Sequence, residues 1–202
     1  MRVSGAPRQN FSLGGICLRI GGQRVSLRSI QENDFPSLWE LMYGEDNPEW
    51  KRWDAPYYPH ARVDFGTFQD QIYQRLARAT VPPMLLIECG DQIIGVVTYY
   101  WEDPASWWLE LGIVIYRPPF WNGGFGTEAL YLWIDYLFQA MPLVRVGLTT
   151  WSGNGRMIRC AEKLVMQMEG RIRKVRRYNE DWYDSIRMGI LREEWDRAQQ
   201  HL

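Results

Sequence analysis

A glycine-rich turn that leads straight into an apolar helix is the part of this sequence best suited to chemistry. Residues 118–129 read PPFWNGGFGTEA, and apolar side chains then recur at helical spacing as far as Phe138. Glycines let the backbone approach a ligand closely, and the first N–H groups of a helix have no partner within that helix. The positive end of the helix dipole adds to them, so the turn indicates an anion-binding site. Taken alone, such a turn is more often structural.

Two common phosphate-binding motifs are excluded at this turn. A Walker loop needs Gly-Lys followed by Ser or Thr, which is absent, and the glycines do not follow the GxGxxG spacing of dinucleotide sites. The surrounding elements also lack the βαβ alternation of a nucleotide-binding fold. A nucleotide-binding regulator is therefore disfavoured.

The elements that must position the turn follow a pattern typical of one α+β domain. Strands are predicted at residues 24–30, 84–88, 92–99, 108–115, 144–150, 168–176 and 182–191. Helices are predicted at residues 35–42, 63–79, 127–138 and 155–164. The sequence therefore predicts an α+β fold of about seven strands and about four helices, with the glycine turn between a strand and a helix.

Length and composition predict a single domain with a short extension at each end. The chain has 202 residues, of which 46% are hydrophobic, and this is enough for one full-sized core. Residues 1–22 are rich in Gly, Ser and Pro and are interpreted as an N-terminal extension. The domain is expected to span residues 23–195, followed by a C-terminal tail at residues 196–202.

Charge and cysteine content narrow the class of partner and the compartment. The formal net charge is -1 and the pI is about 6.2, so no basic surplus indicates nucleic acid or an anionic membrane. No apolar run approaches the roughly 20 residues of a membrane span, and the first residues lack the core of a signal peptide. The cysteines are far apart without a CxxC pair, and His60 and His201 are isolated. A cytoplasmic protein without disulfides or a metal site is expected.

In its motifs the chain resembles the GNAT superfamily of N-acetyltransferases, in the branch of the ribosomal-protein N-terminal acetyltransferases (RimJ/RimL-like). In the glycine turn the matching residues are Trp121, Gly124, Gly126, Thr127, Glu128 and Ala129. Further anchors keep the family's order: Glu110-Leu111-Gly112, Asn154, Glu162-Lys163-Leu164, Glu169-Gly170 and Asp184-Ser185-Ile186. The resemblance runs from about Val25 to Trp195.

Two positions depart from the family's pattern. Trp121 stands where the superfamily's pyrophosphate-binding motif has Arg or Gln, although it matches the Trp of the ribosomal-protein acetyltransferase branch. Val165-Met166 stands where the family has Gly-Phe after Glu-Lys-Leu. The second departure removes the glycine expected to end the helix at residues 155–164.

The resemblance implies a fold and a reaction. The fold is the GNAT fold, a central mixed, mostly antiparallel twisted sheet that splays between the fourth and fifth predicted strands, residues 108–115 and 144–150. The reaction is acetyl-CoA-dependent acetylation of a primary amine, on a protein N-terminus or a small molecule, by direct attack in a ternary complex. A catalytically weak acyl-CoA-binding sensor or scaffold on the same fold is the alternative.

The resemblance also assigns residues to the cofactor. The N–H groups from Phe125 to Thr127 are expected to hold the CoA pyrophosphate, and the preceding strand is expected to pair with the pantetheine arm. Asn154 caps the next helix at the same cleft. The expected cofactor-binding residues are Ile113, Val114, Ile115, Trp121, Gly124, Phe125, Gly126, Thr127 and Asn154.

Two residues are candidates for proton transfer. Glu110 corresponds to a carboxylate that lies near the acceptor amine in many relatives, so it is the expected general base, directly or through water. The other interpretation is a strand glutamate paired with an arginine. Many relatives use a Tyr after Asn154 as the acid for the leaving thiolate, but residues 155–163 contain none. Ser152 or a bound water is expected to take that role.

A loop rich in aromatic residues, at residues 45–59, is expected to receive the acceptor. Trp50, Trp53, Asp54 and Tyr57 would bind a cationic amine through ring faces and charge. An aromatic loop that merely packs on the sheet is equally common. The aromatic content also fits a dimer face, so a homodimer is left open. Arg156 and Arg159 could reach the CoA phosphates, although solvated helix charges are the preferred interpretation.

Overall fold

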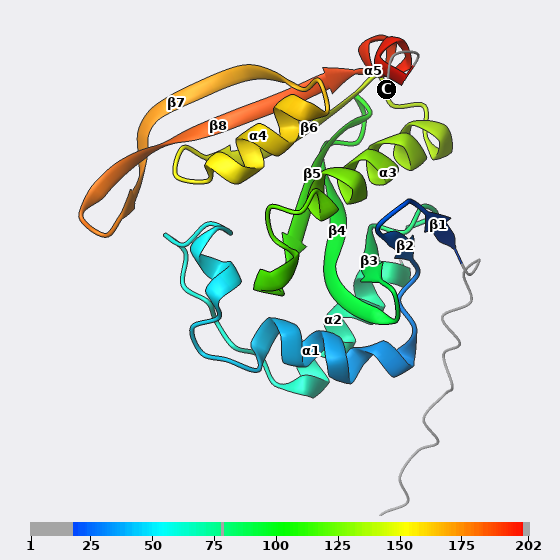
Figure 1. The fold of residues 1–202 in the computed structure, drawn as a ribbon, viewed down its shortest axis with the longest axis vertical. Coiled ribbons are helices and arrows are strands. Elements are labelled where there is room, and N and C mark those ends of the chain that lie inside the picture. Colours follow the sequence, from blue (N-terminus) through cyan, green and yellow to red (C-terminus); the bar gives the residue numbers. More distant parts are fainter. Residues whose placement is uncertain (1–17, 78, 200–202) are drawn as a thin grey trace, which may run out of the picture.

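The computed structural model of the chain describes residues 18–77 and 79–199, which form one eight-stranded sheet with helices on both faces (Figure 1). The strands are β1 (Arg19–Gly21), β2 (Ser26–Arg28), β3 (Met84–Cys89), β4 (Gln92–Asp103), β5 (Trp108–Ile115), β6 (Arg145–Trp151), β7 (Gln167–Tyr178) and β8 (Asp181–Leu191). The helices are α1 (Phe35–Tyr43), α2 (Phe65–Ala77), α3 (Phe125–Ala140), α4 (Gly155–Lys163) and α5 (Arg192–Gln199). The α+β class is confirmed, and every predicted strand and helix is present.

The strand order makes the sheet mixed and mostly antiparallel, as predicted. Across the sheet the order is β1-β2-β3-β4-β5-β6-β8-β7. Within the described residues, β5 and β6 are the one parallel pair. Residues 1–17 of the expected extension, Cys17 among them, and residues 200–202 of the expected tail lie outside the described residues.

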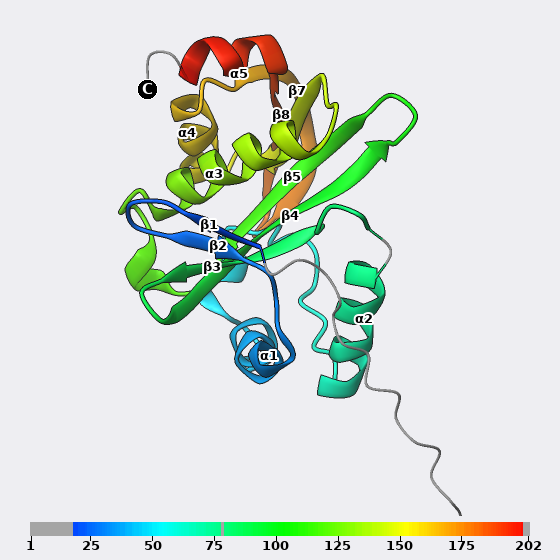
Figure 2. The same ribbon diagram turned by 90° about the vertical axis from the view of Figure 1, so that its right-hand side faces the viewer.

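Side-chain alternation along the strands divides the core into two layers. Helices α3 and α4 cover one face of the sheet, and α1 and α2 cover the other (Figure 2). Within β3, Leu85 and Ile87 belong to the layer of α3, whereas Met84 and Leu86 belong to the layer of α1 and α2. A strand buried on both faces reads as a continuous apolar run, which explains the sequence of β3.

The sheet forks between β5 and β6, which confirms the predicted splay. These two strands pair at Trp108 with Arg145, Leu109 with Val146 and Glu110 with Gly147. Beyond that point β5 runs on to Ile115 paired only with β4, and β6 runs on to Trp151 paired only with β8. The fork therefore leaves the facing backbone edges of both strands open.

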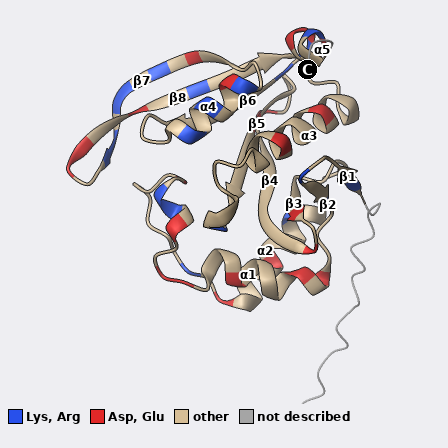
Figure 3. Ribbon diagram, viewed as in Figure 1, with Lys and Arg blue, Asp and Glu red and all other residues tan. Residues whose placement is uncertain are grey.

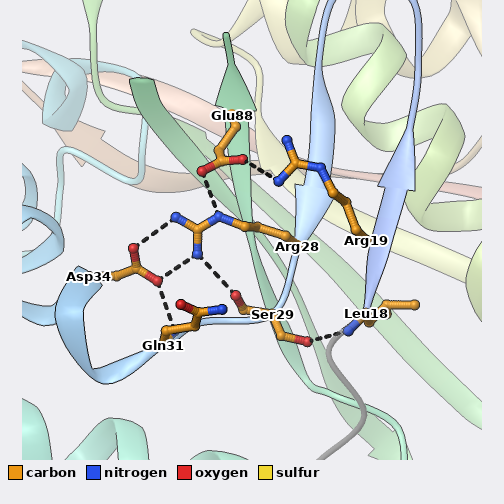
Figure 4. A network of polar contacts seen from close by, with 7 residues as sticks. All are labelled: Leu18, Arg19, Arg28, Ser29, Gln31, Asp34 and Glu88. Carbon is orange, nitrogen blue, oxygen red and sulfur yellow. Dashed lines mark hydrogen bonds and ion pairs between the residues drawn. The ribbon is translucent and has the colours of Figure 1, made fainter. Parts of the chain in front are cut away.

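A largely buried arginine fastens the N-terminal strands and the start of α1 to β3 (Figure 4). Arg28 donates from Nε to Glu88 at 2.5 Å and from its two terminal nitrogens to Asp34 at 2.6 and 2.7 Å. Arg19 on β1 forms an ion pair with the other oxygen of Glu88 at 2.9 Å. The hydrogen bonds with Asp34 outweigh desolvation and, with those to Glu88, raise the pKa of Arg28.

The structure adds β1 and α5 to the predicted elements. β1 has three residues in a glycine-rich stretch, too few for a periodic signal. In α5 only Trp195 is buried, so apolar side chains do not recur along it. Its position is fixed by Arg192, whose guanidinium lies at the end of α3. That group donates hydrogen bonds of 2.7–2.8 Å to the carbonyl oxygens of Phe138, Met141 and Leu143.

Helix α4 ends in a left-handed residue that is not a glycine. Val165 has φ +62°, and its N–H donates to the carbonyl oxygen of Glu162. The next N–H, of Met166, reaches back to Ala161. This is the Schellman pattern that usually requires glycine. The turn expected from the family is therefore kept, at the cost of strain in a β-branched residue.

We expect Val165→Gly to stabilise the protein. A left-handed conformation costs a non-glycine residue roughly 1–2 kcal/mol, part of which the added freedom of unfolded glycine offsets. The side chain is 47% exposed, so little packing is lost. The free energy of unfolding in urea should rise by about 1 kcal/mol, and the Tm by roughly 2–4 °C. Val165→Ala keeps the strain and should gain little. Equal or lower stability of the glycine variant would contradict the strain.

Candidate functional site

A cleft of about 470 Å³ lies where β5 and β6 separate. Most of the predicted site residues line it, from four separate segments of the chain: Trp50, Trp53, Asp54, Tyr57, Ile113, Val114, Ile115, Trp121, Gly124, Gly126, Thr127 and Asn154. Glu110, Phe125 and Ser152 are not among the lining residues. The fork thus brings together the residues predicted for the cofactor and those predicted for the acceptor.

The glycine turn meets the cleft at the start of α3. Gly124 precedes the helix with φ +86°, a left-handed conformation that favours glycine. A Cβ on Gly126 would lie 3.6 Å from Cδ1 of Ile115 and 3.8 Å from Cδ1 of Ile113, so this glycine faces the side chains of the last residues of β5. The N–H groups of residues 125–127 donate to no other described residue. They are the unpaired donors expected of an anion site.

The β1–β2 turn supports the glycine turn from outside the cleft. The Glu128 carboxylate accepts a hydrogen bond from the N–H of Arg24 at 2.8 Å. The Arg24 guanidinium donates to the carbonyl oxygen of Gly123 at 2.6 Å. Glu128, one of the residues that match the family motif, therefore holds the glycine turn in place.

Asn154 joins the two sides of the cleft. Its Oδ1 accepts from the N–H of Met157 at 3.1 Å, which makes it the N-cap of α4 as expected. Its Nδ2 donates to the carbonyl oxygen of Trp53 at 2.9 Å, and Nε1 of Trp151 donates to the same oxygen at 3.1 Å. The aromatic loop is therefore bound to β6 and α4 across the mouth of the fork.

Glu110 lies at the base of the fork and is engaged in a network. Its side chain is 2% exposed and pairs with Arg187 at 3.1 Å. The hydroxyls of Thr149 and Tyr100 donate to its other oxygen at 2.5 and 3.3 Å. Burial, together with the negative charges of Glu110 and Glu102, raises the pKa of Tyr100 to about 12. The arrangement matches the second interpretation of Glu110, a strand glutamate paired with an arginine.

Thr149 connects this network to the cleft. Its residue lines the cleft, while its hydroxyl binds the buried carboxylate of Glu110. Thr149 is a site residue that the sequence motifs do not indicate. The available signal was its place on β6, directly opposite the strand that carries Glu110.

Asp54 is the one carboxylate among the described residues that line the cleft. Asp54 is exposed at the cleft, yet the protein atoms around its carboxyl group desolvate it and so raise its pKa. Lys51 and His60 oppose that rise by charge. A carboxyl whose pKa lies above its usual value is better matched to accept a proton near neutral pH.

Ser152 lies beside the cleft without lining it. Its Oγ accepts a hydrogen bond from the N–H of Asp184 at 2.9 Å, so the hydroxyl is bound to the β8 backbone. Cys160 lines the cleft, half-buried, with its sulfur 3.3 Å from the hydroxyl of Thr127. Burial raises the pKa of the Cys160 thiol. Ser152 is therefore not placed to donate a proton into the cleft, and a thiol with a raised pKa keeps its own proton.

The side of α4 that faces the cleft is basic, whereas solvated helix charges were the preferred interpretation from the sequence. Arg156, Arg159 and Lys163 all line the cleft (Figure 3 shows the basic residues of α4). They follow the Asn154 cap at spacings of i, i+3 and i+7, which is one helix face. That spacing was the signal that could have separated them from solvated charges.

Comparison with known proteins identifies a family. The Acetyltransferase (GNAT) domain matches residues 24–167. The chain is 23% identical over 175 residues to the SPbeta prophage-derived uncharacterized N-acetyltransferase YokL of Bacillus subtilis (strain 168). That match covers 87% of this chain and 94% of the relative.

No helix in the described part of the chain has the length and apolar character to cross a bilayer.

Two solved structures share the fold at low identity. The RimL ribosomal L7/L12 alpha-N-protein acetyltransferase in complex with coenzyme A has a TM-score of 0.71 at 17% identity, covering 86% of this chain and 98% of that one. The spermidine N-acetyltransferase from Vibrio cholerae in complex with CoA and spermine has a TM-score of 0.71 at 18% identity, with 85% and 98% coverage. Such likenesses establish the fold.

We expect Glu110→Gln to weaken the fold. The change keeps the shape but places an amide donor among three donors and removes the charge opposite Arg187. Loss of a buried charge-assisted partner should lower the free energy of unfolding by about 1–3 kcal/mol. Urea unfolding measures it, with Glu162→Gln on the exposed face of α4 as a control that should stay within about 0.5 kcal/mol of wild type. Unchanged stability of Glu110→Gln would mean that the network does not support the fork.

Proposed function

Because the chain belongs to the GNAT acetyltransferase family, we propose that it transfers the acetyl group of acetyl-CoA to a primary amine that enters past the aromatic loop. One observation carries this proposal. A single cleft joins unpaired N–H groups at the start of α3, an open edge of β5 and a loop of rings with one carboxylate. The N–H groups and the open strand edge suit a phosphorylated thioester carrier, and the aromatic loop with its carboxylate suits an amine.

The residues of the cleft fit coenzyme A. The N–H groups of residues 125–127 and the cations of α4 complement phosphates. The unpaired edge of β5 beyond Glu110 offers backbone groups to an extended amide-containing arm. When bound, acetyl-CoA supplies a thioester whose acetyl group an amine can accept. The RimL and Vibrio cholerae structures, solved with CoA, support the same assignment.

The acceptor in this proposal is a primary amine, either a protein N-terminus or a small molecule. RimL is named for a protein N-terminus, and the Vibrio cholerae enzyme for spermidine. In this chain Asp54 and the ring of Tyr57 give the acceptor side a negative charge and an electron-rich face. The charge and the ring both favour binding of the acceptor in its positively charged ammonium form.

Asp54 is the general base in this proposal, in place of Glu110. An amine must lose a proton before it attacks, and the acceptor of that proton must reach the cleft. Asp54 reaches it and has a raised pKa. Glu110 is buried, and its three hydrogen-bond donors are the guanidinium of Arg187 and the hydroxyls of Thr149 and Tyr100. Glu110 therefore positions Thr149 and the fork.

The proton for the leaving thiolate comes from water in this proposal. None of the α4 residues that line the cleft carries a hydroxyl, and Ser152 does not line it. The acyl-CoA-binding sensor remains the alternative. It is distinguished by tight CoA binding without release of free thiol on any amine of a panel of peptides and polyamines.

We expect CoA and acetyl-CoA to raise the Tm in proportion to the logarithm of their concentration, as binding linkage requires. Gly126→Val should lose most of that rise, because its side chain would enter the space between the turn and β5. Gly21→Val is the matched control, since a Cβ there meets no atom within 4 Å. No shift at millimolar acetyl-CoA with folded wild-type protein would refute the proposed function.

We expect Asp54→Asn to lower turnover on the order of 100-fold at neutral pH while leaving CoA affinity unchanged. Free-thiol release across a pH series measures it. In wild type the rate should fall as Asp54 becomes protonated, and in the variant that limb should vanish. Asp46→Asn, an exposed carboxylate of the same loop, is the control. If Glu110→Gln removes the limb and Asp54→Asn does not, the base is Glu110.

We expect Asp54→Asn also to be slightly more stable than wild type at pH values above the usual aspartate pKa of 3.8. A raised pKa in the folded state means that the ionised carboxyl destabilises the fold. That penalty is present at neutral pH and disappears as pH falls below the unfolded value. The stability gain of Asp54→Asn should therefore fade towards pH 3, and solvent access at the cleft keeps it small.

A further inference from the structure

Arg156 stacks against two tryptophans that reach it from separate segments of the chain. Its guanidinium carbon lies 4.0 Å from the ring centroid of Trp53 and 5.1 Å from that of Trp121. The two indoles meet edge to face, with centroids 6.5 Å apart. Trp53 belongs to the aromatic loop, and Trp121 belongs to the glycine turn. One cation on α4 thus joins the acceptor side to the cofactor side.

The contacts with the two rings leave the N–H donors of Arg156 without an acceptor among the described residues. Arg156 makes no hydrogen bond or ion pair with another described residue, and it lines the cleft. A guanidinium carries five N–H donors. An anion in the cleft can therefore accept hydrogen bonds from Arg156 while its guanidinium stays over the indole of Trp53.

The chemistry of the cleft selects a phosphate as that anion. Arg159 and Lys163 lie along the same helix face, and the unpaired N–H groups of the glycine turn border the same cleft. Asp54 is the one carboxylate among the lining residues described, so it cannot neutralise three cations. A guanidinium binds phosphate by short, charge-assisted and often bidentate hydrogen bonds.

Trp53 is held both at its backbone and at its ring, so it can connect phosphate binding at Arg156 to the acceptor loop. Its carbonyl oxygen accepts hydrogen bonds from Trp151 and Asn154, and its ring lies on Arg156. Asp54 follows it immediately in the chain. Whatever fixes the Trp53 ring therefore restricts the carboxylate that faces the acceptor.

We propose that Arg156 binds a phosphate of the acyl-CoA co-substrate through its unpaired N–H donors while it keeps its contact with the ring of Trp53, so that co-substrate binding orders the acceptor loop. The inference rests on the proposed function and adds a coupling to it. The acceptor site is complete only when the phosphates are in place. Acceptor affinity therefore rises once CoA is bound.

Hydrogen exchange of residues 49–58 with and without CoA tests the coupling, alongside CoA affinity by calorimetry. In wild type, saturating CoA should slow exchange of this loop at least about fivefold. Arg156→Gln should bind CoA about tenfold more weakly and lose the slowing even at saturation. Arg156→Lys keeps the charge without the planar stack, so it should recover CoA affinity in part and not the protection.

Two controls separate coupling from simple charge. Lys163→Gln removes a cation from the same helix face without touching Trp53, so it should weaken CoA binding while keeping loop protection. Pantetheine, which lacks phosphates, should give no protection in wild type. Full protection in saturated Arg156→Gln, or unchanged CoA affinity, would overturn the inference and leave the proposed function intact. Failure of wild type to bind CoA would overturn both.

Discussion

The fork between β5 and β6 is the constraint on which the rest of the site depends. Pairing stops after Glu110 and Gly147, so the facing backbone groups of both strands lose their sheet partners. Unpaired backbone groups are costly unless water or a ligand satisfies them, so the fork is stable only as an open cleft. Glu110 stands at the last paired position and binds β4, β6 and β8 through Tyr100, Thr149 and Arg187. A buried carboxylate thus holds together the strands at the point where the sheet divides.

The open cleft in turn requires cross-connections at its mouth. The loop that follows α1 crosses the fork and is bound to the far side at Trp53. The long β7–β8 hairpin reaches the same loop, where the Arg176 guanidinium lies 5.0 Å from the ring centroid of Tyr57. These contacts are ring faces and single hydrogen bonds, which are weaker than sheet pairing and easier to rearrange. The acceptor side is accordingly the adaptable half of the site, and the turn at α3 is the rigid half.

The sequence predicts most of the fold because its strands and helices carry strong periodic signals. The glycine turn was recognisable because Gly124 and Gly126 perform a backbone task that other residues do poorly. β1 and α5 were missed because three residues, or a helix with one buried side chain, produce no period. The partners of Glu110 could not be read either, since Arg187 lies 77 residues away and only the strand order brings it close. The spacing of the basic residues marks one face of α4, but only the fork shows that this face lines the cleft.

The departure at Trp121 becomes intelligible through the same geometry. The superfamily's pyrophosphate-binding motif has Arg or Gln at this position, whereas the branch that the chain resembles has Trp. Here the indole N–H donates to the carbonyl oxygen of Ile115 at 2.8 Å, which closes the free end of β5. The ring then faces the guanidinium of Arg156. In the proposed scheme Arg156 on α4 supplies a cation at this end of the cleft. Because the rings of Trp53 and Trp121 meet edge to face, its guanidinium contacts the acceptor loop and the start of the glycine turn together. Trp121 thereby links the two sides of the proposed site.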